Sequence, residues 1–183
     1  MREIFLAGGC FWGLQKYFDI VPGVLSTQAG YANGKTEDPT YNQVCAGNTG
    51  FAETVKIQYN ELQISLKDIL HLFFRVVDPT VKNRQGNDVG EQYRTGIFYL
   101  DEGDRMIIDA VVAEEQKKYG TAIVTEVSPL KNYYTAEEYH QNYLDKNPGG
   151  YCHIGNDDFL YAQNFILEKQ GELASTGAGL AAK

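Results

Sequence analysis

The clearest pattern along the chain is an alternation of apolar and polar residues between positions 51 and 59. Val55 and Ile57 fall on one face of the strand that this alternation predicts, and polar residues fall on the other. The same alternation puts Glu53 on the apolar face, where loss of hydration raises the pKa of a carboxyl and favours its neutral form. A strand that begins only at Thr54 would instead leave Glu53 in a hydrated turn, and both interpretations fit the pattern.

Shorter apolar runs and helical spacings complete the predicted elements. Thr40 and Ser65 each open a capping box, which predicts a short helix to about residue 46 and a longer one after Ser65. The polar, Gly-containing stretch from residue 80 to residue 94 has no regular pattern, and a loop of this length inside a domain is typically functional. We predict strands at 3–7, 24–31, 51–59, 96–100 and 122–127, and helices at 12–18, 41–46, 66–77, 102–118, 136–146 and 159–169.

Cys10 stands at the junction between the first predicted strand and the first predicted helix. Gly8 and Gly9 end the strand, so the thiol is placed where the helix begins. Unpaired N–H groups and the helix dipole favour an anion there, which predicts a thiol that ionises more readily than a free one. Phe11 and Trp12 follow directly and would give any substrate of the thiol a flat apolar wall. A buried structural cysteine is the alternative, but the flanking glycines favour a reactive one.

The composition is that of one domain without a nucleic-acid or membrane surface. The chain has 183 residues, with 16 Lys and Arg against 24 Asp and Glu and a formal charge of −8. No apolar run approaches the roughly 20 residues that span a bilayer, and the start of the chain lacks the pattern of a secretory signal. We expect one catalytic domain at residues 1–170 and a disordered, Gly- and Ala-rich tail at residues 171–183.

The cysteines and histidines indicate redox chemistry without a metal. Cys10, Cys45 and Cys152 are too few and odd in number for a disulfide scaffold, so we expect a protein of the reducing cytoplasm. A Glu-x-x-His pair, Glu137 and His140, occurs only once, and the other histidines are scattered. A di-iron site of this type needs a second copy of the pair. The sequence therefore predicts no metal and no other cofactor.

Five short stretches carry a further signal. They are Gly-Cys-Phe-Trp-Gly at residues 9–13, Thr-Tyr through Cys at 40–45, Gly-Phe-Ala-Glu at 50–53, the run of residues 85–94, and Tyr-His-Gln through Gly-Gly-Tyr-Cys at 139–152. Each is weak alone, but in this order they resemble the A-type peptide methionine sulfoxide reductases. The resemblance implies a two-layer α+β sandwich of ferredoxin-like type, with a mixed sheet and long irregular loops. It also implies reduction of the S epimer of methionine sulfoxide, free or in proteins.

The resemblance implies a role for each side chain around the thiol, and these roles make chemical sense. Reduction of a sulfoxide needs a soft nucleophile, which Cys10 supplies as a thiolate. The departing oxygen must be protonated, and a neutral Glu53 is a suitable general acid. The other residues would hold the substrate: Tyr41 and Tyr93 by hydrogen bonds to the oxygen, Phe11 and Trp12 by contact with the S-methyl group, and Asp88 by ordering water or the tyrosines.

Cys152 is the second redox residue that the resemblance implies. It would resolve the sulfenic acid left on Cys10, and thioredoxin would reduce the resulting disulfide. The preceding Asn-Pro-Gly-Gly suits a mobile arm. We expect a monomer, with Cys45 structural and buried on the inner side of its short helix. The sequence departs from the family pattern at Phe51, where we expect His, and no cysteine follows Cys152 to form a second relay disulfide.

Two other functions fit the sequence. A cysteine hydrolase would use Cys10 with His140 or His153 as its base, but the aromatic pair and the acid suit protonation of an oxygen better. A binding module without catalysis would stack a ligand on Trp12 and the tyrosines. Such a module would keep its ligand after Cys10→Ser, whereas a reductase would lose all turnover.

Overall fold

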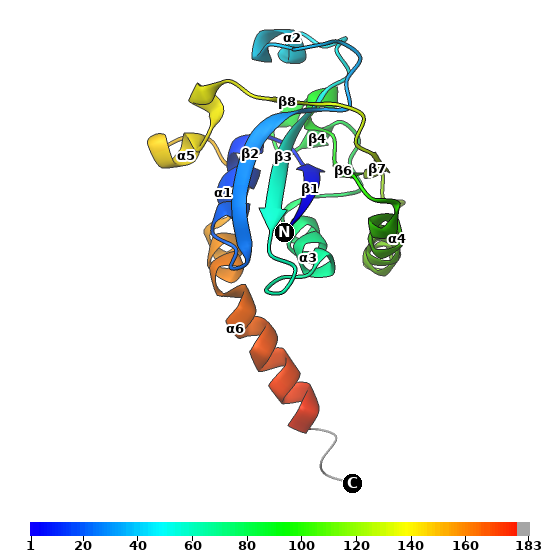
Figure 1. The fold of residues 1–183 in the computed structure, drawn as a ribbon, viewed down its shortest axis with the longest axis vertical. Coiled ribbons are helices and arrows are strands. Elements are labelled where there is room, and N and C mark those ends of the chain that lie inside the picture. The colour runs from blue at the N-terminus through cyan, green and yellow to red at the C-terminus, as the bar shows by residue number, and fades with distance from the viewer. Residues whose placement is uncertain (179–183) are drawn as a thin grey trace.

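One mixed sheet organises the chain, and the helices pack on it (Figure 1). The computed structural model describes residues 1–178. The strands are β1 (Arg2–Ala7), β2 (Val24–Ala32), β3 (Ala52–Tyr59), β4 (Arg84–Gln85), β5 (Asp88–Val89), β6 (Gly96–Tyr99), β7 (Glu126–Pro129) and β8 (Tyr133–Thr135). The helices are α1 (Phe11–Asp19), α2 (Tyr41–Cys45), α3 (Leu66–Val76), α4 (Glu102–Gln116), α5 (Tyr143–Lys146) and α6 (Asn156–Ala178), with 3-10 turns η1 (Glu91–Tyr93) and η2 (Glu138–His140).

The inner strands of the sheet have the ferredoxin-like order β6-β1-β3-β2. β1 is antiparallel to both β3 and β6, and β2 is antiparallel to β3. Two crossover units, β1-α1-β2 and β3-α3-β6, therefore interlock in one sheet. β8 extends the sheet beyond β2, and β7 extends it beyond β6 as a parallel neighbour. The predicted α+β sandwich with a mixed sheet is confirmed.

The two faces of the sheet carry different cores, because successive side chains on a strand point to opposite faces. Ile4, Val55 and Ile57 belong to the main core, which buried side chains of α1, α3, α4 and α6 complete. Phe5 belongs to a small second cluster on the other face. Since Glu53 has the same parity as Val55 and Ile57, its carboxyl points into the helical layer.

Both predicted capping boxes are present. The Thr40 side chain accepts a hydrogen bond from the Gln43 N–H, and the Gln43 side chain bonds back to the Thr40 backbone at the start of α2. Ser65 and Asp68 make the same reciprocal pair at the start of α3. The first turn of α2 is therefore fixed locally, and Tyr41 occupies it as predicted.

The strand predicted at 122–127 is displaced. The structure instead has β7 at Glu126–Pro129, so the strand begins later and includes a proline. β7 lies at the edge of the sheet and pairs only with β6. Proline is tolerated at such an edge because no neighbour needs its missing N–H.

The helix predicted at 136–146 is wrong. β8, η2 and the short α5 occupy this segment. The Gln141 side chain ties it to the edge of β2, because it bonds both the N–H and the C=O of Ala29 at 2.9 Å. Asn142 then adopts a left-handed conformation with φ of 51° and interrupts any helix. Hydrogen bonds to the sheet edge thus outweigh local helix propensity here.

The last helix is longer than predicted. α6 runs from Asn156 to Ala178 instead of over 159–169, and it extends away from the rest of the molecule (Figure 1). The tail expected at residues 171–183 is helical as far as Ala178, and residues 179–183 lie outside the described residues. The division of the chain into one catalytic domain and a tail stays a prediction.

The long loop between α3 and β6 is ordered and leads toward α1. It contains the β4–β5 hairpin and η1. Gln85 anchors the hairpin, because its buried side chain bonds the N–H and the C=O of Asp78 at 2.9 and 2.7 Å. The hairpin carries Asp88 and η1 carries Tyr93. Both lie near Cys10, because the charge of Asp88 raises the pKa of Cys10 and the charge of Cys10 raises the pKa of Tyr93. The loop is therefore part of the site, as its composition predicts.

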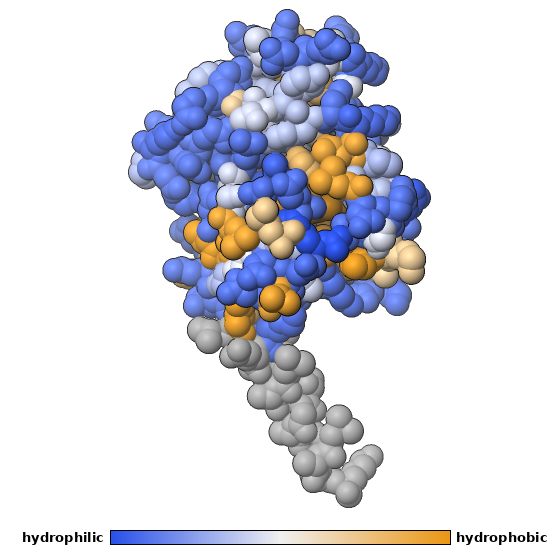
Figure 2. Space-filling model, viewed as in Figure 1, coloured by the Kyte–Doolittle hydropathy of each residue, from blue (hydrophilic) through white to orange (hydrophobic). Residues whose placement is uncertain are grey.

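The face of the molecule shown in Figure 2 is mostly hydrophilic. Hydrophobic residues on it form small separate patches and no continuous surface. Within residues 1–178, no helix has both the length and the apolar character needed to cross a membrane.

Candidate active site

Cys10 lies at the junction that the sequence predicts. β1 ends at Ala7, and Cys10 is the extended residue directly before the first turn of α1. Gly9 has φ of 79°, and a Cβ on it would lie 2.7 Å from the Cβ of Gln85. Only glycine therefore lets the chain pass so close to the hairpin. The Cys10 side chain is 8% exposed and belongs to the main core.

Burial dominates the ionisation of Cys10. Loss of hydration raises the pKa of the thiol well above its ordinary value, and the charges of Glu53 and Asp88 raise it further. The Trp12 backbone N–H at the helix terminus lowers the pKa but does not compensate. The expectation of a readily ionised thiol is therefore wrong for the free protein.

Glu53 is a buried acid beside Cys10. Because β3 begins at Ala52, Glu53 lies within the strand, and the hydrated-turn alternative is wrong. Its side chain is 1% exposed and accepts a 3.1 Å hydrogen bond from the Phe11 N–H. Burial raises the pKa of the Glu53 carboxyl to about 8, while the Phe11 N–H lowers it and the charge of Asp88 adds a small increase. At neutral pH the carboxyl is mainly protonated, as the strand pattern predicts.

Tyr41 and Tyr93 bring two phenols to Glu53 from α2 and η1. Burial raises the pKa of both phenols, and the charge of Glu53 raises both further. Both hydroxyls therefore stay protonated and can donate hydrogen bonds. Burial also raises the pKa of Asp88, whose Oδ2 has no hydrogen-bond partner among the described residues. The structure thus brings the predicted polar residues together around Cys10.

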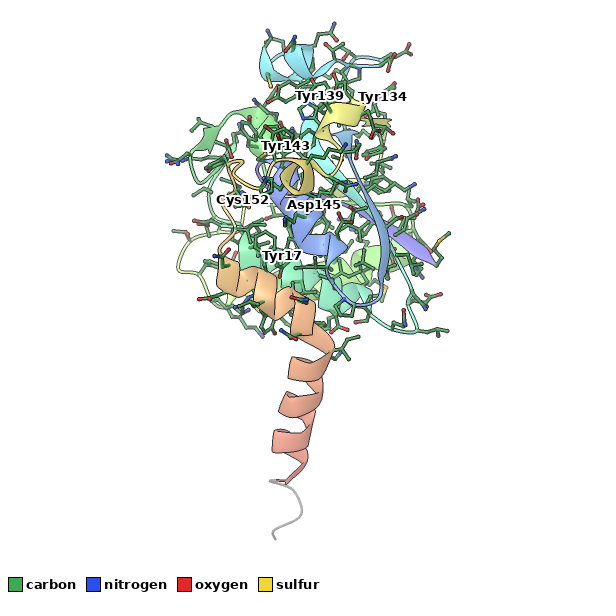
Figure 3. The ribbon with its side chains drawn as sticks, turned by 90° about the vertical axis from the view of Figure 1, so that its left-hand side faces the viewer. Tyr17, Tyr134, Tyr139, Tyr143, Asp145 and Cys152 are labelled. Carbon is green, nitrogen blue, oxygen red and sulfur yellow. The ribbon has the colours of Figure 1, made fainter. Side chains whose placement is uncertain are left out.

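Phe11 and Trp12 form an aromatic wall next to the thiol, and neighbouring rings support it. The Trp12 indole stacks on Tyr143, with ring centroids 3.8 Å apart and planes inclined by 14°. Figure 3 labels Tyr143, which begins α5. Trp12 Nε1–H donates a 3.0 Å hydrogen bond to His140 Nδ1. The buried Phe11 ring lies 5.1 Å from the His140 ring, so one imidazole contacts both members of the wall.

His140 supports Trp12 as a neutral imidazole, a role that the sequence did not predict. Its side chain is 1% exposed, and the rings of Tyr41 and Tyr139 lie 4.4 and 4.1 Å from it. Nδ1 can accept the Trp12 N–H only when it carries no proton. Burial lowers the pKa of His140, against the opposing charge of Glu137. The two partners are 128 residues apart, and no sequence spacing links them.

Glu137 fixes the start of α2 and therefore Tyr41, and this role was also missed. Its carboxylate accepts the Tyr41 N–H at 2.8 Å and the Tyr31 hydroxyl at 2.7 Å. Burial opposes ionisation, but the hydrogen bonds from Tyr41 and Tyr31 lower the pKa of Glu137 below its usual value. The sequence treated this residue only as part of a Glu-x-x-His pair. Within the described residues, no group of three His, Cys, Asp or Glu side chains could hold a metal ion.

Cys152 lies on the arm between α5 and α6. Figure 3 shows it beside α1, with Tyr143 above it and Tyr17 below. Its sulfur lies against Gly13, since a Cβ built there would be 2.8 Å from Cys152 Sγ. Burial raises the pKa of the Cys152 thiol, while the Ile154 N–H and the charge of Lys16 lower it. No disulfide joins Cys10 to Cys152 in this structure.

Cys45 is exposed, and the expectation of a buried structural cysteine is wrong. The short helix α2 turns Val44 inward, so the next residue faces outward. Burial raises the pKa of the Cys45 thiol, and the Tyr41 hydroxyl, one turn earlier on the same helix, lowers it. Cys45 therefore lies at the edge of the site, beside a phenol that we expect to bind substrate.

Phe51 stands where the family pattern suggests His, and it is buried directly before β3. Its ring packs edge-on against Tyr134, with centroids 5.7 Å apart and planes at 84°. A Cβ on Gly34 would clash with the same ring. The position is therefore filled by apolar packing, which makes the surroundings of β3 less polar without removing the acid at Glu53.

Neither histidine of the hydrolase alternative is arranged as a base for Cys10. His140 uses Nδ1 to accept the Trp12 N–H. His153 is enclosed beside Gly9, and burial lowers its pKa. Among the described residues, neither ring donates to or accepts from the Cys10 thiol. The geometry does not favour a hydrolase.

The fold and the site define a class of protein. It is a two-layer α+β enzyme in which a buried cysteine precedes a helix, a protonated carboxyl lies beside it, and a second thiol rests on a neighbouring arm. Such a combination of two thiols and an acid is suited to redox chemistry at a substrate heteroatom.

Comparisons with known proteins identify the family. A model of the family described as peptide methionine sulfoxide reductase matches residues 2–170. The chain belongs to this family and is an oxidoreductase. It is 58% identical over 154 residues to the peptide methionine sulfoxide reductase MsrA of Clostridium acetobutylicum, a match that covers 84% of this chain and 95% of that protein.

Solved structures agree with this assignment. Reduced Mxr1 from Saccharomyces cerevisiae has a TM-score of 0.80 at 41% identity, over 84% of this chain and 91% of that chain. Mxr1 in complex with Trx2 has a TM-score of 0.56 at 30% identity, over 78% of this chain and 84% of that chain. The six-stranded sheet and the helices on it therefore correspond to a known enzyme fold.

Replacement of His140 by Phe tests how the aromatic wall is held. The variant keeps a ring in the cluster but removes the acceptor for the Trp12 N–H. We expect the fluorescence maximum of Trp12, the only Trp in the chain, to shift to shorter wavelength. We also expect KM for a sulfoxide substrate to rise about 2- to 10-fold, the equivalent of one hydrogen bond of about 0.5–1.5 kcal/mol, with a smaller effect on kcat.

His71→Phe is the matched control, because His71 is half-exposed on α3 and bonds only to acidic side chains of α4. It should change neither the emission nor KM. An unchanged emission maximum in the His140→Phe variant would contradict the assigned hydrogen bond.

Proposed function

We propose that the chain reduces the S epimer of methionine sulfoxide, free or in proteins, to methionine, with Cys10 as the nucleophile. The observation that carries the proposal is the pair formed by a buried thiol and a buried carboxyl with a pKa of about 8. A sulfoxide is an uncharged group whose oxygen must gain a proton as the S–O bond breaks. A neutral acid in a dry pocket is suited to supply that proton.

The reductive step follows from the protonation of Cys10 and Glu53. Glu53 donates its proton to the sulfoxide oxygen, and the proton that leaves the Cys10 thiol returns the acid to its neutral form. The substrate S–O bond breaks, an S–O bond forms on Cys10, and the products are methionine and a sulfenic acid. The substrate sulfur gains two electrons and the Cys10 sulfur loses two. No net charge enters the site, which suits its low polarity.

The surrounding residues orient the substrate for this step. Phe11 and Trp12 would contact the S-methyl group, because sulfur and methyl groups pack favourably on aromatic rings. Tyr41 and Tyr93 are protonated phenols near Glu53 and would donate hydrogen bonds to the oxygen. Asp88 has an unpaired buried oxygen and would order water or the phenols around it.

Recycling would use Cys152. Its thiol attacks the Cys10 sulfenic acid, a disulfide forms, and the oxygen leaves as water with the thiol proton. Thioredoxin would then reduce the disulfide. The structural likeness to Mxr1 in complex with Trx2 supports this partner. A small dithiol such as dithiothreitol would also reduce the sulfenic acid directly.

The cytoplasm is the expected place of action. Cys45 is exposed. An exposed thiol at the edge of a redox site persists best in a reducing compartment. The reductant that we propose for Cys152 also belongs to such a compartment.

The direct test is the reduction of the separated S and R epimers of methionine sulfoxide with dithiothreitol. Wild-type protein should reduce the S epimer only, and Cys10→Ser should abolish the activity with little effect on the fold, because serine is nearly isosteric. Equal rates with both epimers, or clear activity of the Cys10→Ser variant, would contradict the proposal.

Glu53→Gln should slow methionine formation by ~10²–10⁴-fold at neutral pH, the usual contribution of a positioned acid. In the wild type, the single-turnover rate should fall as pH rises through about 8, where Glu53 loses its proton. Single-turnover measurements on both sides of pH 8 avoid the titration of an added thiol. If Glu53→Gln lowers the single-turnover rate by the same factor on both sides of pH 8, the role of Glu53 is structural instead.

The stability of the same variant distinguishes the acid from a packing residue. The folded carboxyl has a pKa of about 8 against an ordinary value of 4.5. Its contribution to the free energy of unfolding is therefore complete below pH 4.5 and is lost as pH rises through 8. Each unit of difference between the folded and unfolded pKa corresponds to about 1.4 kcal/mol. Glu53→Gln should remove this loss. Urea unfolding of both proteins over this range measures it, and parallel curves would contradict a buried neutral carboxyl.

Cys152→Ser should separate reduction from recycling. Without added reductant, the variant should still form one methionine per protein and lose one thiol, whereas the wild type should lose two. Turnover with thioredoxin should collapse, and turnover with dithiothreitol should survive. Quenched single turnover followed by thiol counting measures the difference.

Cys45→Ser is the control, because Cys45 is the other thiol at the site. It should behave as the wild type does. A Cys152→Ser variant that still loses two thiols would mean that Cys45 resolves the sulfenic acid.

A further inference from the structure

The arm that carries Cys152 lies against three glycines from two parts of the chain, the start of α1 and the β4–β5 hairpin. A Cβ on Gly9, before α1, would lie 3.2 Å from His153 Cε1. A Cβ on Gly86, in the turn of the hairpin, would lie 3.2 Å from the Tyr151 hydroxyl and 3.4 Å from His153 Cβ. Gly13, within α1, faces Cys152 itself. Residues 151–153 thus pack against three glycines, in space that a side chain at these positions would occupy.

Gly13 differs from the other two glycines. Gly9 and Gly86 have φ of 79° and 56°, so their backbone conformation already favours glycine. Gly13 lies inside α1 and is buried, without a positive φ. Alanine is a better residue than glycine in a helix interior. The conformation of the helix therefore gives no reason for glycine at position 13.

The contacts of Gly13 supply the reason. A Cβ there would lie 2.8 Å from Cys152 Sγ and 3.7 Å from Ile154 Cδ1, and its three nearest neighbours all belong to the arm. Gly13 also follows Cys10 by three residues, which places it on the same side of the first turn of α1. The missing side chain thus leaves a notch between the position of Cys10 and the Cys152 sulfur.

We propose that Gly13 is a positioning residue for disulfide formation, whose notch holds the Cys152 sulfur for attack on the oxidised Cys10. The inference rests on the proposed function and concerns its second step. In that step, the S–S bond forms as the S–O bond of the sulfenic acid breaks, and the oxygen leaves as water with the Cys152 proton. The two Cα atoms of a disulfide must come within about 7 Å. A methyl group in the notch would push the arm outward and oppose that approach.

Gly13→Ala tests the proposal because alanine suits the helix and fills only the notch. The first methionine of a single turnover should form at the wild-type rate. Loss of the second thiol should slow by ~10²-fold, the scale of a displacement of reacting atoms on the order of 1 Å. Turnover with thioredoxin should fall with it, while turnover with dithiothreitol should be unchanged. Quenched thiol counting during a single turnover gives both rates.

Two further variants make the result decisive. Gly120→Ala is the matched control, since nothing lies within 4 Å of a Cβ at this position, and it should behave as the wild type does. The double variant Gly13→Ala/Cys152→Ser should turn over with dithiothreitol as fast as Cys152→Ser alone, which shows that α1 and the reductive site are intact.

The possible outcomes separate this inference from the function on which it rests. The role of the notch would be overturned if Gly13→Ala lost its second thiol at the wild-type rate. It would also be overturned if the variant slowed formation of the first methionine as much as loss of the second thiol. A wild type that forms no methionine, or that loses only one thiol, would instead overturn the proposed function.

Discussion

The burial of the Glu53 carboxyl is the constraint on which the site depends. β3 is paired with β1 on one side and with β2 on the other, so the strand cannot turn this residue toward water without loss of ladder hydrogen bonds. Inside the helical layer the carboxyl meets the Phe11 N–H, directly after Cys10. One hydrogen bond thus connects the central strand to the helix that presents the thiol. The burial that would destabilise a charged carboxyl keeps its proton up to a pH of about 8.

The same burial explains why the thiol need not be ionised in the free enzyme. Cys10 and Glu53 each raise the cost of a negative charge on the other, because both lie in the same poorly hydrated space. A substrate oxygen that accepts the Glu53 proton removes this conflict, since the thiol proton can then replace it. The helix terminus lowers the pKa of Cys10 through the Trp12 N–H, but it acts against burial and does not overcome it. Reactivity would therefore depend on the bound substrate, which also limits oxidation of the resting thiol.

Local patterns predicted the parts of the site that local chemistry fixes. Alternation gave the inner face as one of two positions for Glu53, and the capping box at Thr40 placed Tyr41 in the first turn of α2. The helix predicted at 136–146 failed because Gln141 bonds the distant edge of β2. The support of Trp12 by His140 was missed for the same reason, as it spans 128 residues. Such contacts depend on the finished sheet, and no spacing within a single sequence encodes them.

Tyr143 connects the aromatic wall to the arm that carries Cys152. One face of its ring stacks on Trp12. A Cβ on Gly150, at the base of the arm, would lie 3.1 Å from Tyr143 Cε1 and 2.9 Å from Leu144 Cδ2, so the arm begins in contact with α5. A movement of the arm during the proposed disulfide formation would therefore act on the ring that stacks on Trp12. Since packed side chains fit closely, the proposed closing of the arm would also affect the proposed hold of Trp12 on the methyl group. In the proposed cycle, the two half-reactions would therefore share one side chain, because Tyr143 contacts both Trp12 and the base of the arm.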